Sequence, residues 1–234
     1  MRTTGRLAII FGIVGFSGLL SVTTGQAARP TSRAGGTPTL DNAMWNKLSA
    51  LRSYHAESTL KWTGSAAKPG TVHWTEDVHG KDYHLTLISS SGSTQRSDMY
   101  FVGGHFYIGE GGHFMDLGNV GKQMAAAMLP MTMGYWTALT QDGHNVHYVG
   151  RVTTSGRTAY RFTVQYAVSA PGVGGNPLTV ARALFTNTVD IDVATHAPLR
   201  VTGLFRGQGE GQSFSLSTSF LVSHVGQVGA IKVP

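Results

Sequence analysis

The sequence contains no cysteine among its 234 residues. This absence excludes disulfides, iron–sulfur clusters and thiolate metal sites. It also excludes the acylated cysteine that anchors exported bacterial lipoproteins. The stability of the folded chain must therefore come from packing and hydrogen bonding.

Charged side chains are also scarce, at 13% of the residues. The formal net charge is +6, but the lysines and arginines are scattered singly along the chain. Nucleic-acid binding requires a clustered basic surface, so we expect no nucleic-acid partner. Glycine, in contrast, accounts for 31 residues, and serine and threonine are abundant. Such a composition favours an extracellular, mainly β protein.

The N-terminal region has the layout of a secretory signal peptide. Arg2 and Arg6 precede the apolar run Leu7–Leu20, and small residues follow within Gly25–Ala27. The run is shorter and richer in glycine than a membrane-spanning helix, which needs about 20 mostly apolar residues. We therefore expect a leader over residues 1–27 and an exported protein, periplasmic or extracellular. The alternative is an uncleaved leader that keeps the protein at the membrane.

The remainder of the chain is predicted to form one domain. Residues 28–38 are polar and rich in proline and glycine, which is typical of a flexible linker, and residues 39–234 form the folded domain. One helix is expected to begin at the N-cap Thr39 and to end near Tyr54. A second is expected over residues 119–133. The apolar positions of the first helix are Met44, Leu48 and Leu51.

Elsewhere apolar and polar residues alternate with a period of two. In 160–166, for example, Tyr160, Phe162 and Val164 alternate with Arg161 and Thr163. This pattern predicts a meandering antiparallel sheet of about 8–11 strands with one buried face. The fold class is therefore mainly β (α+β), an open antiparallel half-barrel with two helices across its concave face.

Two short helices are too small to cover the apolar face of such a sheet, so we expect an apolar hollow. Five of the eight methionines fall within residues 115–133. Methionine is flexible and suits varied apolar shapes, which favours a soft lid, although the same residues could simply fill an irregular core. The predicted lining comprises Leu60, Trp62, Val72, Trp74, Tyr83, Leu85, Leu87, Phe162, Val164 and Ile191, with Met124, Met128 and Leu129 near the mouth.

Several local phrases, in their order, resemble a known family. They are Gly104–Ile108, Gly112–Gly118, Val189–Val201 and Phe214–Val222. Together they resemble the mycobacterial cell-envelope lipoproteins LppX and LprG and, more distantly, the LolA/LolB lipoprotein carriers. The resemblance implies an open half-barrel that binds the acyl chains of lipids, lipoglycans or lipoproteins and moves them through the envelope. The family's lipobox cysteine is missing here, which bears on membrane attachment and not on lipid binding.

Two alternative readings of the sequence are a metal site and a pair of catalytic carboxylates. The chain has ten histidines, but it contains no HExxH motif, and His144 and His147 point to opposite faces of a strand. We therefore expect scattered surface histidines and no metal site. Asp190 and Asp192 share one strand face about 7 Å apart, as paired catalytic carboxylates can. We expect a solvated strand face instead.

No motif supports catalysis. The chain lacks a GxSxG elbow, and Gly207–Gly211 has neither the helix nor the lysine of a phosphate-binding loop, so it is predicted to be a hairpin turn. We expect a non-catalytic lipid carrier without a cofactor, which makes transient contact with a membrane or an envelope protein. The alternatives are an envelope sensor that grips a polypeptide with the same open sheet, and a hydrolase with an unrecognised site.

Overall fold

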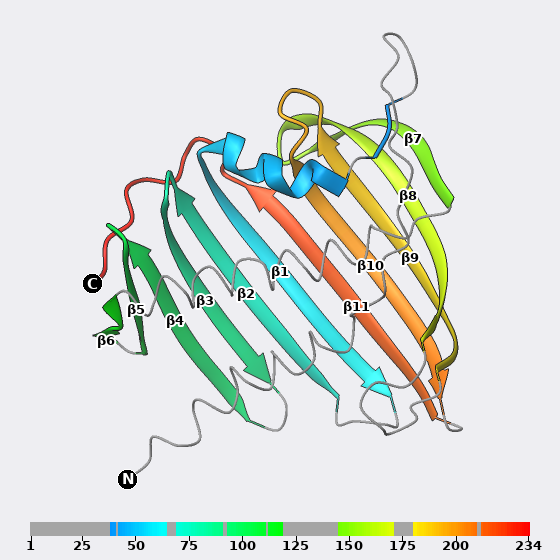
Figure 1. The fold of residues 1–234 in the computed structure, drawn as a ribbon, viewed down its shortest axis with the longest axis horizontal. Coiled ribbons are helices and arrows are strands. Elements are labelled where there is room, and N and C mark those ends of the chain that lie inside the picture. The colour runs from blue at the N-terminus through cyan, green and yellow to red at the C-terminus, as the bar shows by residue number, and fades with distance from the viewer. Residues whose placement is uncertain are drawn as a thin grey trace.

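The computed structural model describes residues 38–40, 42–64, 69–90, 93–110, 112–118, 145–170, 180–209 and 212–234. These ranges contain the 3-10 helix η2 (Asn42–Leu51) and eleven strands (Figure 1). The strands are β1 (Ser53–Gly64), β2 (Gly70–His79), β3 (Asp82–Ser90), β4 (Thr94–Val102), β5 (His105–Glu110), β6 (His113–Asp116), β7 (Asn145–Thr154), β8 (Arg157–Ala170), β9 (Val180–Asp192), β10 (Pro198–Gly209) and β11 (Gln212–Ser223).

All eleven strands belong to one antiparallel sheet. Their order is β6-β5-β4-β3-β2-β1-β11-β10-β9-β8-β7, so each strand pairs with its neighbour in sequence except at the centre, where β1 pairs with β11. The described strands β6 and β7 form the two edges and do not pair with each other. The sheet is therefore open, and the predicted mainly β, antiparallel half-barrel is confirmed.

The register separates the side chains into two faces, because partners in an antiparallel pair lie on the same side. We call the face that carries η2 the concave face and the other the convex face. Across β8, β9, β10 and β11, one concave row is Phe162, Val189, Val201 and Phe220, all buried. The adjacent convex row is Thr163, Thr188, Thr202 and Ser219. The alternation predicted from the sequence thus describes both faces.

Two apolar clusters lie on the concave face. In the first, the helix cluster, Met44, Leu48 and Leu51 of η2 pack against buried side chains of β1 and β8–β11. The second, the β3–β5 cluster, is formed by the buried residues Tyr83, Met99 and Phe106 with half-buried neighbours. Val78 of β2 packs against both clusters, so it marks the seam between them.

The helix begins and ends inside the limits expected from the sequence. It starts at Asn42 instead of Thr39 and stops at Leu51, and Tyr54 is already part of β1. Arg52 ends the helix because its φ of 58° lies in the left-handed region, which reverses the chain direction.

Several predictions fall outside the described residues. These include the leader, the second helix over residues 119–133, and Met124, Met128 and Leu129. The part of the chain that the structure describes contains no helix long and apolar enough to cross a membrane. The structure places Gly207–Gly209 at the end of β10, where Gly209 pairs with Gln212 of β11, and residues 210–211 of the predicted turn lie outside the described residues.

Candidate functional site

The ten predicted lining residues that the structure describes all lie on the concave face. The register aligns Leu60 with Val72, Trp74 with Leu87, and Phe162 with Val189 of the first concave row. The remaining positions have the same phase along their strands. The alternation pattern therefore identified one contiguous surface, although its contact with a ligand stays a prediction.

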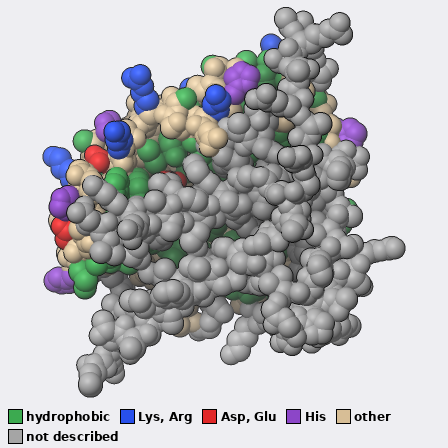
Figure 2. Space-filling view, in the orientation of Figure 1, with side chains coloured by type: hydrophobic (Ala, Val, Ile, Leu, Met, Phe, Trp, Pro, Cys, Tyr) green, Lys and Arg blue, Asp and Glu red, His purple; other side chains and the backbone are tan. Residues whose placement is uncertain are grey.

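This surface differs in packing from one half to the other. Phe162, Val164 and Ile191 are buried in the helix cluster beneath η2. Leu85 and Leu87 are only half-buried against the β3–β5 cluster. Between the two clusters, three large apolar side chains of β1 and β2 remain partly exposed: Leu60, Trp62 and Trp74. Figure 2 shows hydrophobic side chains on this side of the molecule, with Lys, Arg and His side chains along its upper margin.

A groove of about 350 Å³ lies at the ends of β1–β4, and half of its lining residues, Lys61, Thr71, Ser90 and Thr94, form one convex row. One wall includes Trp62, whose indole lies directly on Gly70. A side chain at position 70 would overlap the ring, so glycine is needed there for close approach. The groove is lined by Lys61, Trp62, Pro69, Gly70, Thr71, Ser90, Ser93 and Thr94.

A carboxyl group interrupts the apolar concave face. Glu76 lies in the concave row between Ala56 of β1 and Leu85 of β3 and is half-buried. Burial raises the pKa of Glu76 to about 7, and the nearby charge of Asp77 adds to this increase. Sequence reasoning missed Glu76, although it has the same phase as the apolar residues Trp74 and Val78.

Two tyrosines flank this carboxyl. Tyr54 and Tyr83 occupy the next concave row, where both are aligned with Val78. Burial raises the pKa of each phenol, and the charge of Glu76 raises both further. The hydroxyl of Tyr83 is buried, and among the described residues it has no hydrogen-bond partner. This group of polar atoms, which we call the Glu76 cluster, lies at the seam between the two apolar clusters.

A second polar group crosses the concave face on β9, β10 and β11. Asn187, Gly203 and Thr218 are aligned in one row, and Asn187 and Thr218 are buried. Gly203 leaves the space between the two polar side chains open, because a Cβ there would overlap both.

The expectation of a solvated face at Asp190 and Asp192 is wrong. Asp190 is 0% exposed and Asp192 is 2% exposed. Arg161 donates two hydrogen bonds to Asp190, at 2.7 and 2.8 Å, and Thr154 donates a third at 2.8 Å. The register explains the pairing, since Arg161 stands directly opposite Asp190 on β8. Sequence alternation alone does not reveal which residue of another strand will be opposite.

Asp192 is held in the same way by Arg157, whose Nη2 donates to it at 2.8 Å. Burial alone would raise the pKa of Asp192, but the hydrogen bonds from Arg157 and Thr195 lower it below its usual value. Both carboxylates are therefore ion-paired structural groups, which argues against a pair of catalytic carboxylates.

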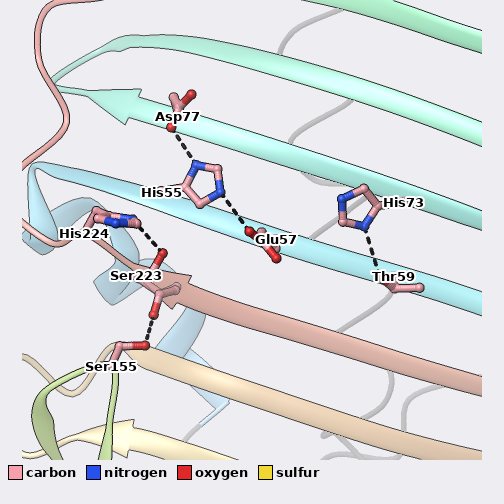
Figure 3. Close-up of polar contacts among 9 residues, drawn as sticks. His55, Glu57, Thr59, His73, Asp77, Ser155, Ser223 and His224 are labelled. Carbon is pink, nitrogen blue, oxygen red and sulfur yellow. Dashed lines mark hydrogen bonds and ion pairs between the residues drawn. The ribbon is translucent and has the colours of Figure 1, made fainter.

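The convex face carries histidines paired with carboxylates. His55 Nδ1 lies 2.7 Å from Asp77 Oδ1, and its Nε2 lies 3.3 Å from Glu57 Oε1 (Figure 3). Both ring nitrogens of His55 thus face carboxylates, so neither is directed at a hydroxyl nucleophile. Elsewhere in Figure 3, His73 Nδ1 lies 3.1 Å from Thr59 Oγ1. Within the described ranges, no three His, Asp or Glu side chains are grouped so that they could hold a metal ion.

A second groove, of about 420 Å³, lies on the convex face. Asp98 in its wall accepts two hydrogen bonds from Arg96, at 2.9 and 3.0 Å, and one from Thr86 at 2.6 Å. The ring of His84 stacks on that of Tyr100 with centroids 4.1 Å apart. These groups bind one another, which indicates that they stabilise β3 and β4.

Comparison with protein-family models gives no match, and neither does a comparison with curated protein sequences. Solved structures that align with the chain include LprF from Mycobacterium bovis, at 10% identity, with 82% of this chain and 95% of that chain covered and a TM-score of 0.41. LppX from Mycobacterium tuberculosis aligns at 12% identity, with coverages of 83% and 100% and a TM-score of 0.37. A LolA superfamily protein from Nitrosomonas europaea aligns at 8% identity, with coverages of 76% and 91% and a TM-score of 0.26. At these values, function has to be argued from the residues of this chain.

Proposed function

We propose that this protein is a non-catalytic carrier that holds the acyl chains of lipids, lipoglycans or lipoproteins against its concave face. The observation that carries the proposal is a mainly apolar face on which large side chains remain partly exposed. Leu60, Trp62 and Trp74 lie between the two apolar clusters and belong to neither, and each stays partly exposed. An exposed apolar surface of this kind is typical of a binding site.

Burial of an acyl chain on this surface would supply enough free energy for binding. Each methylene removed from water contributes about 0.8 kcal/mol, so about ten methylenes contribute about 8 kcal/mol. That amount corresponds to a dissociation constant of about 1 μM before the entropic cost of association. A carrier needs reversible binding, for which this range is suitable.

The absence of a catalytic role is part of the proposal. On the convex face, Asp77 and Glu57 both face the ring of His55. The buried aspartates of β9 are neutralised by arginines. The leader-like N-terminal sequence supports export, and we propose that the carrier works in the periplasm or outside the cell, with transient contact to a membrane or an envelope protein.

Two neighbouring residues of β3 provide a matched test. Leu87 lies on the concave face and Ile88 on the convex face, and both are half-buried. We expect Leu87→Lys to abolish uptake of a fluorescent fatty acid by the purified protein, whereas Ile88→Lys should leave uptake close to the wild-type level. Equal uptake by wild type and Leu87→Lys would show that acyl chains do not bind at this face.

A protein-interaction module is the second candidate, and the edge strand β7 favours it. Val149 is 58% exposed and Val146 is 39% exposed on this edge. An unpaired strand edge can accept an added strand from an extended polypeptide. Native mass spectrometry of the protein purified from its own organism separates the candidates. Bound lipid of defined mass supports the carrier, and an empty protein that retains an exported polypeptide supports the interaction module.

A further inference from the structure

Glu76 is a half-buried carboxyl group on a mainly apolar face. Both influences on its pKa, burial and the charge of Asp77, make the ionised form less favourable. Among the described side chains, the concave positions of β1–β4 and β8–β11 include no lysine or arginine. An acid in such surroundings is costly to the fold, which suggests that it serves a purpose other than stability.

The surroundings of Glu76 provide further polar atoms. Tyr54 and Tyr83 lie diagonally across from it on the two adjacent strands, at a separation of about 7–8 Å between backbones, which long side chains can bridge. The hydroxyl of Tyr83 is the second observation, because this residue is only 8% exposed and its oxygen has no hydrogen-bond partner in the described part of the chain. Buried hydroxyl groups normally have one, so an orphaned hydroxyl requires an explanation.

These polar groups lie where the polar end of a ligand on the concave face would be expected. Tyr54 belongs to the helix cluster and Tyr83 to the β3–β5 cluster, and Val78 contacts both clusters. The Glu76 cluster therefore lies at the seam, next to the partly exposed apolar surface formed by Leu60 and Trp74. An acyl chain on that surface would bring its polar end within reach of the seam.

We propose that Glu76 and the hydroxyls of Tyr54 and Tyr83 form a polar anchor that binds a hydrogen-bond-donating headgroup, such as the free hydroxyl of a diacylated glycerol or glycolipid. The anchor rests on the proposed carrier function and specifies its ligand class. A carboxylate accepts a hydrogen bond from such a hydroxyl, and a phenol can donate one to its oxygen. A phosphate at the same place would face a like charge, and the described concave positions of β1–β4 and β8–β11 offer no cation to balance it, so anionic headgroups should bind more weakly.

The test compares three pyrene-labelled probes. The first two have the same acyl chains and differ only in the headgroup, and the third has no headgroup. They are a diacylglycerol, the matching phosphatidic acid, and a plain pyrenyl alkane, each offered to the full-length protein from phosphatidylcholine vesicles. The wild type is expected to prefer diacylglycerol over phosphatidic acid by about tenfold, which is the usual effect of one hydrogen bond to a charged group. Uptake of the alkane measures binding to the apolar surface alone, because this probe has no polar group.

Four variants distinguish the anchor from a structural role. Glu76→Gln removes the charge but keeps an acceptor, so uptake of phosphatidic acid should rise while uptake of diacylglycerol changes little. Tyr83→Phe and Glu76→Leu should each weaken diacylglycerol uptake severalfold relative to alkane uptake. Glu57→Gln, which removes the same charge from the convex face of β1, is the control and should change none of the three.

The outcomes separate the anchor from the carrier. Equal uptake of diacylglycerol and phosphatidic acid by the wild type, unchanged in Glu76→Gln, overturns the anchor and leaves the carrier intact. In that case an ordered water, and not a headgroup, satisfies the Tyr83 hydroxyl. If the wild type takes up no probe, including the alkane, the carrier itself is refuted and the anchor with it.

Discussion

Replacing Glu76 by glutamine should make the protein more stable, and by an amount that depends on pH. The pKa of Glu76 is raised from its ordinary value of 4.5 to about 7 in the folded protein. Between these two values the folded state holds a proton that the unfolded state has lost. Stability therefore falls as the pH rises from about 4.5 to about 7 and stays lower above that range.

The size of the effect follows from the two pKa values. Their difference corresponds to about 3 kcal/mol, at 1.36 kcal/mol for each pH unit. Because glutamine carries no charge at any pH, Glu76→Gln should exceed the wild type by up to about 3 kcal/mol at pH 8.5. At pH 4.5 most of this advantage should have disappeared, since Glu76 of the wild type is then protonated in the folded state.

Urea unfolding followed by far-UV circular dichroism at pH 4.5, 6 and 8.5 measures this difference. Glu57→Gln serves as the control, because Glu57 is exposed on the convex face of the same sheet. If the unfolding free energies of the wild type and Glu76→Gln differ by the same amount at all three pH values, the reasoning is refuted. It would mean that burial does not disfavour the charged form of Glu76.

Three further predictions concern the structural polar groups. Arg161→Leu should lower the free energy of unfolding by about 3–5 kcal/mol, because Asp190 is left buried and unpaired. In urea titrations, the double variant Arg161→Leu/Asp190→Asn should regain much of this free energy. The pKa values of Asp98 and Asp192 are lowered, so the stability of the protein should decrease as the pH falls below about 4. The midpoint of thermal unfolding should therefore fall in acid, and a midpoint that does not change between pH 5 and 2 would contradict this. Gly203→Ala should destabilise the protein by about 1–3 kcal/mol, because the added methyl group overlaps Asn187 and Thr218, and an unchanged urea midpoint would show that the row can relax.

The sequence determined the two faces of the sheet. Alternation with a period of two is a local property, since successive side chains of a strand point to opposite sides. For this reason Leu60, Trp74 and Phe162 could be assigned to one surface although more than a hundred residues separate the first from the last. The turn at Gly103 and Gly104 was also predictable, because glycine adopts the positive φ angles that this tight turn requires.

The tertiary structure alone decided which residues meet across strands. Arg161 and Asp190 are 29 residues apart, and His55 and Asp77 are 22 apart, so only the register brings each pair together. The same holds for Glu76 and its two tyrosines, whose strands meet through the pairing of β1, β2 and β3. A strand's own sequence specifies which side of the sheet each residue faces, whereas the residue opposite it depends on the free energy of the whole sheet. For this reason the apolar surface was predictable from the sequence and the contacts of its polar groups were not.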